Sequence, residues 1–183
     1  MALLAEVLVE EWLNRQGFFT IRGLKLGVHE MDLLAIRPKG DGSIECRHVE
    51  VQASVNPISY MTRLTKADQV ALKRSATSSG ARTPEQIQRG VEEWVQKKFG
   101  RPTKTSMLRQ LAPGPWSREL VIHRLKHPEE LDMLIEAGIM IHRLSDILRE
   151  MRQVKGKVSR ASGSDFMDLL FFEDGSDSLD RAP

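Results

Sequence analysis

Hydrophobic and polar positions in the first third of the chain follow two different periods. Apolar residues recur at three- and four-residue spacing in 3–16, where Leu4, Val7 and Trp12 share one face, and this pattern predicts a helix that ends at Gly17. The next apolar segments are rich in β-branched or aromatic residues and are bounded by glycine, proline and aspartate, which favours extended structure. We therefore expect strands at 18–23, 30–38 and 44–54.

The rest of the chain carries weaker signals that alternate between helical and extended patterns. A basic helix is expected at 63–75, and a second helix from Pro84 to Phe99 follows the capping residue Thr83. Residues 101–116 hold three prolines, so we expect them to be irregular. Further strands are expected at 119–125 and 139–144, with helices at 127–138 and 145–153.

Two acidic residues, Asp32 and Glu50, lie within the second and third of these strands. An Asp-Gly turn at residue 41 joins the two strands as a hairpin. Asp32 and Glu50 each stand nine residues from residue 41, so antiparallel pairing places them opposite one another, with Cβ atoms about 5 Å apart. Alternation in the third strand puts His48, Glu50 and Gln52 on one face. The hairpin thus predicts a pair of facing carboxylates.

Carboxylates at this separation repel each other unless positive charge lies between them. Mg²⁺ suits the position, because it takes one or two carboxylates together with water and phosphate oxygens. Arginine or lysine side chains would satisfy the same pair without any metal. The residues alone leave both interpretations of Asp32 and Glu50 open.

Charge is distributed unevenly along the 183 residues. Residues 60–127 carry 14 Lys and Arg against five Asp and Glu, a net charge of +9, whereas the whole chain has +2. A stretch of this kind is what a phosphate-binding surface needs, although solvated helix faces also carry basic residues. The charge pattern therefore indicates nucleic acid as one partner without excluding an ordinary surface.

The ordered set of motifs resembles the PD-(D/E)xK nuclease superfamily, and within it the archaeal-type Holliday junction resolvases. Glu6 lies in a helix that leads into Gly17-Phe18, and Asp32 begins the string Asp-Leu-Leu-Ala. Glu50 lies in the string Val-Glu-Val-Gln-Ala-Ser of 49–54. These strings match the acidic helix, the Asp strand and the Glu-x-Lys strand of the superfamily. The resemblance implies an α/β fold with a restriction-endonuclease-like αβββαβ core, in which helices flank a mixed central sheet.

The resemblance also implies an enzyme, a Mg-dependent endonuclease that hydrolyses phosphodiester bonds, with DNA as the expected substrate. Asp32, Glu50 and the backbone carbonyl of Val51 would ligate Mg²⁺, for which Mn²⁺ would substitute. Glu6 would reach the same centre from the first helix. The rival interpretation is a non-catalytic member of the fold that binds nucleic acid or a partner protein while another subunit does the chemistry.

Gln52 stands where the superfamily usually has lysine. A lysine there orients the attacking water and stabilises the charge that builds on the phosphate, whereas glutamine can only hold the water by hydrogen bonds. We expect the missing cation to come from Lys25 or Lys66. The side chains expected to hold the sugar-phosphate backbone are Arg22, Lys25, Lys66, Lys73 and Arg74.

One nuclease-like domain is expected over 1–154, with a basic insertion of helix and loop at about 75–117. Residues 155–183 form an acidic tail with an apolar motif at 165–172. This motif could bind a partner protein, dock on its own domain and cover the basic surface, or pack as one more element of the core. A homodimer is compatible with the same organisation.

Composition excludes several classes of protein. The chain has 40% hydrophobic and 28% charged residues, as globular proteins do, and no apolar run reaches the roughly 20 residues that a transmembrane helix needs. The acidic N-terminus does not resemble a secretory signal. Cys46 is the single cysteine, which excludes a disulfide framework. We therefore expect a cytoplasmic protein that does not bind membranes.

Overall fold

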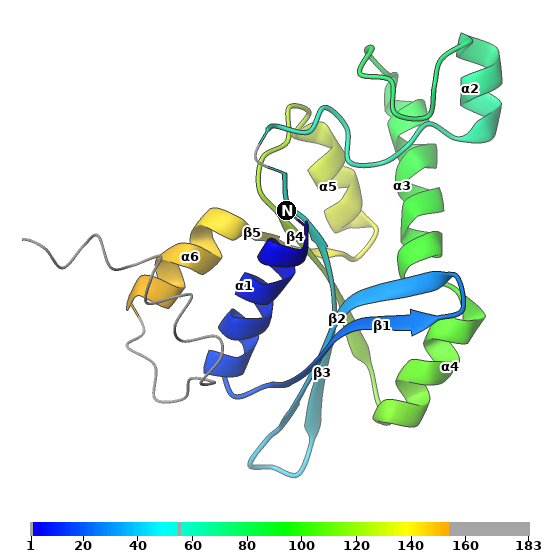
Figure 1. Ribbon diagram of the computed structural model, residues 1–183. Coiled ribbons are helices and arrows are strands. Elements are labelled where there is room, and N and C mark those ends of the chain that lie inside the picture. The colour runs from blue at the N-terminus through cyan, green and yellow to red at the C-terminus, as the bar shows by residue number, and fades with distance from the viewer. Residues whose placement is uncertain (1, 55, 154–183) are drawn as a thin grey trace, which may run out of the picture.

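A mixed sheet forms the centre of the computed structural model, which describes residues 2–54 and 56–153 (Figure 1). The strand order is β1-β2-β3-β4-β5; the first three strands pair antiparallel, and β3, β4 and β5 pair parallel. The strands span Phe19–Leu26 (β1), His29–Pro38 (β2), Ile44–Gln52 (β3), Trp116–Ile122 (β4) and Met140–Arg143 (β5). The α/β class and the mixed central sheet expected from the sequence are confirmed.

The β2–β3 hairpin adopts the register that the sequence predicts. Leu33 lies opposite Val49, at equal distance from residue 41 on the two strands. The Asp41 carboxylate closes the turn by accepting hydrogen bonds from the N–H and the hydroxyl of the serine two positions on. The same register, continued by one residue, sets Asp32 against Glu50.

Helices cover both faces of the sheet. In the described part of the chain they are α1 (Ala2–Arg15), α2 (Lys66–Leu72), α3 (Pro84–Lys98), α4 (Pro102–Leu111), α5 (Glu129–Glu136) and α6 (Leu144–Gln153). The first and last helices, α1 and α6, pack on one face, and α3 and α5 pack on the other (Figure 1). α4 packs through Leu108 against Met31 and Leu34 of β2. The hairpin that carries the two acids therefore lies between α1 on one side and α3 and α4 on the other.

Apolar side chains fill the space between the helices and the sheet. Leu13 of α1 packs in one cluster with Val49 of β3, and Val91 of α3 packs in the other with Leu120 of β4 and Leu134 of α5. All five side chains are completely buried. Full burial of such a side chain contributes about 1.5–3 kcal/mol to folding. The site thus stands on a scaffold that is packed from both sides.

The expectation that residues 101–116 are irregular is wrong. α4 occupies Pro102–Leu111, and β4 already begins at Trp116. Pro102 stands in the first turn of the helix, where its missing N–H has no consequence because that group has no partner within a helix. The two prolines at 113 and 115 follow the helix, so they bound it instead of disrupting it.

The segment expected as a basic insertion, about 75–117, contributes to the core. Ile87 and Val91 of α3 are buried in the cluster that packs on the sheet. The acidic tail at 155–183, with its apolar motif at 165–172, lies outside the described residues. Among the residues that are described, no helix is long and apolar enough to cross a membrane.

Candidate functional site

The side chains of Asp32 and Glu50 meet at the end of the hairpin that lies farthest from its turn. Asp32 Oδ2 accepts a hydrogen bond of 2.9 Å from the backbone N–H of Val51. The N–H and C=O of an extended residue point to the same side of its strand, so the carbonyl of Val51 also faces β2. Glu50 is completely buried, and the Nε2 atom of His48 lies 3.1 Å from its Oε1. The structure therefore places two carboxylates and one carbonyl oxygen together.

Two lysines from the helices supply positive charge to this pair. Lys98, the last residue of α3, donates a hydrogen bond to Oε2 of Glu50, and its Nζ lies 3.9 Å from Oδ1 of Asp32. Lys104 of α4 is almost completely buried, with its Nζ 3.5 Å from Oε1 of Glu50. The same ammonium donates to the backbone carbonyls of Glu30 and Lys98 at 2.7 and 2.9 Å. Charge compensation at the site thus comes from α3 and α4.

Burial and mutual repulsion act differently on the two carboxyl groups. Burial, followed by the charge of Glu50, raises the pKa of Asp32 from 3.8 to about 7. Burial also opposes ionisation of Glu50, but the hydrogen bond from His48 and the charge of Lys98 hold its pKa below the ordinary value. Burial also lowers the pKa of Lys104. Of the two acids, Asp32 is therefore the one whose charged form the surroundings disfavour, chiefly because it is buried.

The donor atoms at this position suit a hard cation. Asp32 and Glu50 offer carboxylate oxygens and Val51 offers a carbonyl oxygen, which are the ligand types that Mg²⁺ prefers. Burial, and after it the charge of Glu50, raises the pKa of Asp32, and the charge of Lys98 opposes that rise. Within the described part of the chain, no three His, Cys, Asp or Glu side chains are arranged to hold a metal ion by themselves. Water and phosphate oxygens would have to complete the coordination.

Glu6 and Gln52 border the carboxylate pair. Glu6 is half-buried on α1, and burial together with the nearby charge of Glu30 raises its pKa. The charge of Glu50 acts on the pKa of Glu6 in the same direction, so Glu6 lies within electrostatic reach of Glu50. Gln52 is the last residue of β3 and lines the same cleft as Lys98. Lys98 and Gln52 therefore line one cleft from α3 and β3.

Arg22 and Lys25 are the two nucleic-acid contacts predicted on β1, and their surroundings differ from each other. Arg22 forms an ion pair with Glu10 of α1, with 3.1 Å between Nη1 and Oε2. Lys25, farther along β1, is exposed. Lys25 was one of the two lysines expected to supply the missing cation, and the structure places it in solvent while Lys98 contacts the carboxylates. Lys25 therefore does not supply the cation at the carboxylate pair in this structure.

The other predicted contacts lie in and after α2. Lys66 is exposed at the start of this helix, and Lys73 ends it in a left-handed conformation with φ of 51°. Arg74 donates a hydrogen bond of 3.0 Å to the carbonyl oxygen of Ala81 and so fastens the loop that follows. α2 and the loop that follows it lie at one end of the molecule, and α3 runs from that end toward the β1–β2 strands (Figure 1).

Lys98 is not among the site residues predicted from the sequence, although its position along α3 indicates that it is partly buried. Val91 and Trp94 belong to the apolar stripe of α3, and Lys98 follows Val91 by seven residues, which is two turns of a helix. A lysine on a buried stripe must find a partner, because burial of an unpaired charge is costly. Lys104 shows the same signal, since it precedes the buried Leu108 of α4 by four residues.

Comparisons with known proteins do not assign the chain to a family. No family model and no curated protein matches the sequence. Among solved structures, the chain is similar to the crystal structure of a protein of unknown function, AF1548, with 12% sequence identity and a TM-score of 0.44. The match covers 80% of this chain and 65% of that protein, so the chain spans less than two thirds of its length.

Proposed function

We propose that the chain is a metal-dependent nuclease with a restriction-endonuclease-like core, which hydrolyses phosphodiester bonds in DNA. The observation that carries this proposal is the meeting of Asp32, Glu50 and Lys98 from the ends of β2, β3 and α3. These are the two acids and the cation that the superfamily needs. Here the cation comes from a helix, and Gln52 occupies its usual position on the strand.

Each residue of the site has a separate role in this proposal. Asp32, Glu50 and the carbonyl of Val51 would hold Mg²⁺ or Mn²⁺, which when bound activates a water and neutralises charge on the phosphate. Glu50 fixes the position of Lys98, whose ammonium stabilises the negative charge that grows on the phosphate. Gln52 holds the attacking water through hydrogen bonds.

The distribution of charge supports DNA as the substrate. Residues 60–127, which include α2 and α3, carry a net charge of +9. Contacts of Lys25 and Lys66 with phosphates would make binding fall steeply as the salt concentration rises. Glu6 would complete the centre from α1 by holding a second ion or a water.

A cytoplasmic location is part of the same proposal. The thiol of Cys46 is buried and free, which suits a reducing compartment such as the cytoplasm. A homodimer and a protein partner for residues 155–183 are two further proposals. The results of cleavage and binding assays do not depend on either of them.

Cleavage assays test the proposed activity. Supercoiled, linear and branched DNA and RNA are incubated with the protein in Mg²⁺, in Mn²⁺ and in EDTA. We expect cleavage of DNA in either metal and none in EDTA. Glu50→Gln should abolish it, whereas the control Glu92→Gln, which replaces an exposed acid on α3, should not. Cleavage that persists in EDTA would contradict a metal-dependent mechanism.

A non-catalytic DNA-binding subunit is the alternative function. The ion pairs that Lys98 and Lys104 form with Glu50 favour it, because they neutralise the buried carboxylate without any metal. Such a protein would bind DNA in EDTA with a steep salt dependence and leave it intact in Mg²⁺ and Mn²⁺. The closeness of Asp32 to Glu50 favours the enzyme, because a bound cation would offset the repulsion between the two carboxylates.

A further inference from the structure

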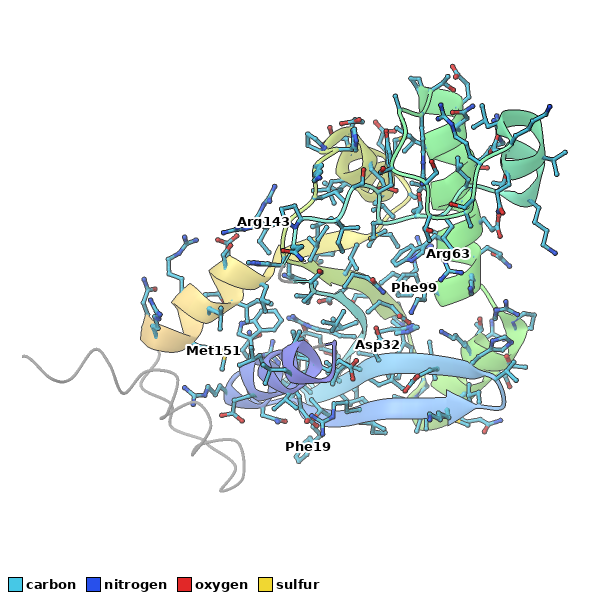
Figure 2. The ribbon with its side chains drawn as sticks, turned by 45° about the horizontal axis from the view of Figure 1, so that its top comes forward. Phe19, Asp32, Arg63, Phe99, Arg143 and Met151 are labelled. Atoms are coloured by element: carbon cyan, nitrogen blue, oxygen red, sulfur yellow. The ribbon has the colours of Figure 1, made fainter. Side chains whose placement is uncertain are left out.

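A cleft of about 510 Å³ adjoins the carboxylate pair, and we name it the α3 cleft. Gln52 and Lys98 line it at the end next to the pair, and the segment 58–63 forms one wall. α3 forms the opposite wall, and Thr77 lies at the rim. Figure 2 labels Arg63 and Asp32 toward the two ends of this region. A substrate strand in the cleft would therefore lead directly to the acids.

The wall at 58–63 is fixed by a buried carboxylate. Glu130 of α5 is completely buried, and it accepts hydrogen bonds of 2.7 and 2.8 Å from the N–H groups of Met61 and Thr62. It also accepts one from the Thr62 hydroxyl. Arg82 in addition donates to the carbonyl of Thr62 at 2.9 Å. Because two charged side chains hold this wall, the cleft is formed before any ligand arrives.

A glycine lets α3 approach this wall closely. A Cβ atom at Gly90 would lie 2.8 Å from Oγ1 of Thr62 and 3.0 Å from the carbonyl oxygen of Arg63. Any larger residue would push the helix and the wall apart. The contact at Gly90 therefore fixes how far apart the two walls of the cleft stand. The cleft volume of about 510 Å³ lies in the range of pockets that bind small ligands.

Trp94 is the aromatic surface that the cleft offers to a ligand. Tyr60 also lines the cleft, but Arg82 covers one face of its ring at 4.0 Å and His127 stacks on the other at 4.1 Å. Trp94 is half-buried, and Phe99 contacts it edge-on at 5.7 Å between ring centroids. Trp94 also packs against the buried cluster of α3, β4 and α5, so the part of its ring that lines the cleft is the part on which a base could stack.

Charges and hydroxyls complete the lining in the pattern that a nucleotide needs. Arg63, Lys97 and Lys98 provide positive charge for phosphates. Ser59 and Glu93 provide hydrogen-bonding groups for the edge of a base. Stacking on an aromatic ring together with cations along the strand is how proteins bind unpaired nucleotides.

We infer that the α3 cleft receives one unpaired nucleotide of the DNA strand, with its base on Trp94 and its phosphate at Lys98. This inference rests on the proposed function and narrows its substrate class. A base within a continuous duplex would have to leave its stack to enter, at a cost of a few kcal/mol. The substrate is therefore DNA with unpaired nucleotides next to the cleaved bond, such as a fork, a flap or a single strand.

The first test closes the cleft from its rim. Thr77 is exposed and lines the cleft, so Thr77→Trp places a large side chain over the entrance without altering the core. Ser79→Trp is the matched control, because Ser79 is exposed in the same loop and belongs to none of the cleft walls. The substrates are a forked duplex with 2-aminopurine in its unpaired arm and a fully paired duplex of the same sequence.

Two signals are measured with these substrates. In EDTA, wild type and Ser79→Trp should quench the 2-aminopurine fluorescence of the fork by stacking, and Thr77→Trp should not. In Mg²⁺, wild type should cleave the fork about tenfold or more faster than the duplex, and Thr77→Trp should lose this preference. Equal cleavage of fork and duplex, with no effect of Thr77→Trp on either signal, would overturn the inference.

The two proposals fail in different ways. Quenching that Thr77→Trp abolishes, without cleavage of any substrate, would refute the nuclease and leave the nucleotide site standing. A measurement that needs no variant guards against misfolding: ultraviolet crosslinking of 5-iododeoxyuridine in the unpaired arm to the wild-type protein, mapped by mass spectrometry. We expect the crosslink at Trp94. A crosslink confined to other segments would contradict the assignment of the cleft.

Discussion

The ammonium group of Lys98 donates a hydrogen bond to Oε2 of Glu50, a residue 48 positions earlier in the chain. Glu50 is completely buried, so the contact joins the end of α3 to the end of β3 inside the protein. A buried carboxylate without such a partner would be protonated instead of charged. Together with the hydrogen bond from His48, the contact keeps Glu50 ionised, and it fixes one cation beside the carboxylate pair.

Replacement of Lys98 tests its role in the chemistry. Lys98→Met keeps the apolar stem and removes the charge, and we expect the single-turnover rate of DNA cleavage to fall by about 100-fold or more. Glu50 still has Lys104 and His48 as partners, so the variant should fold. Lys126→Met is the control, because Lys126 is exposed and does not line the cleft. A similar small effect in both variants would remove Lys98 from the mechanism.

A second substitution should restore the lost cation from the strand. In the double variant Lys98→Met with Gln52→Lys, the lysine returns to the position that it occupies in most of the superfamily. We expect it to recover about tenfold or more of the lost rate, because Gln52 and Lys98 line the same end of the cleft. Gln52→Ala in the wild-type background should lower the rate and leave metal affinity unchanged. No recovery in the double variant would show that positions 52 and 98 are not equivalent.

The protonation of Asp32 should make stability depend on pH. Its pKa is raised from 3.8 to about 7 in the folded protein. Between these values the unfolded chain releases the proton while the folded protein keeps it, so stability falls as pH rises and levels off above the folded pKa. Asp32→Asn removes this loss. Its gain in melting temperature in EDTA should grow from about pH 4 to about pH 7 and then stay constant. A gain that does not change with pH would contradict the raised pKa.

Glu130 should be important for stability although it is a charged residue. Glu130→Ala removes the carboxylate that accepts hydrogen bonds from the N–H groups of Met61 and Thr62. We expect a loss of about 3 kcal/mol in the free energy of unfolding, measured with urea, because buried donors then lose their acceptor. Glu129→Ala, at the exposed neighbouring position, should change it little. Equal effects would mean that the wall of the α3 cleft does not depend on Glu130.

The carboxylate pair could be predicted because it depends on local structure. A tight turn at Asp41 sets the register of two consecutive strands, so counting residues from the turn places Asp32 opposite Glu50. The alternation of β3 likewise predicts that His48 and Glu50 share a face, as the hydrogen bond between them shows.

The partners of the pair could not be predicted in the same way. Lys98 reaches Glu50 only because α3 lies in the long connection between β3 and the parallel strand β4 and packs on the sheet. No local rule fixes where such a crossover helix ends. The types of these residues also favour the wrong prediction, because charged side chains near helix ends usually lie in solvent. Lys98 ends α3 and Glu130 lies in the first turn of α5, yet both contact buried groups.

Single-turnover cleavage of forked DNA by Asp32→Asn, in Mg²⁺ and at about pH 8, tests the central claim most directly. The substituted amide would keep the shape of the side chain and lose the charge that holds the metal, and stability should not suffer. We predict a rate at least about 100-fold below that of the wild type, with DNA binding in EDTA retained. A variant that cleaves as fast as the wild type would show that the carboxylate pair of Asp32 and Glu50 is not the active site.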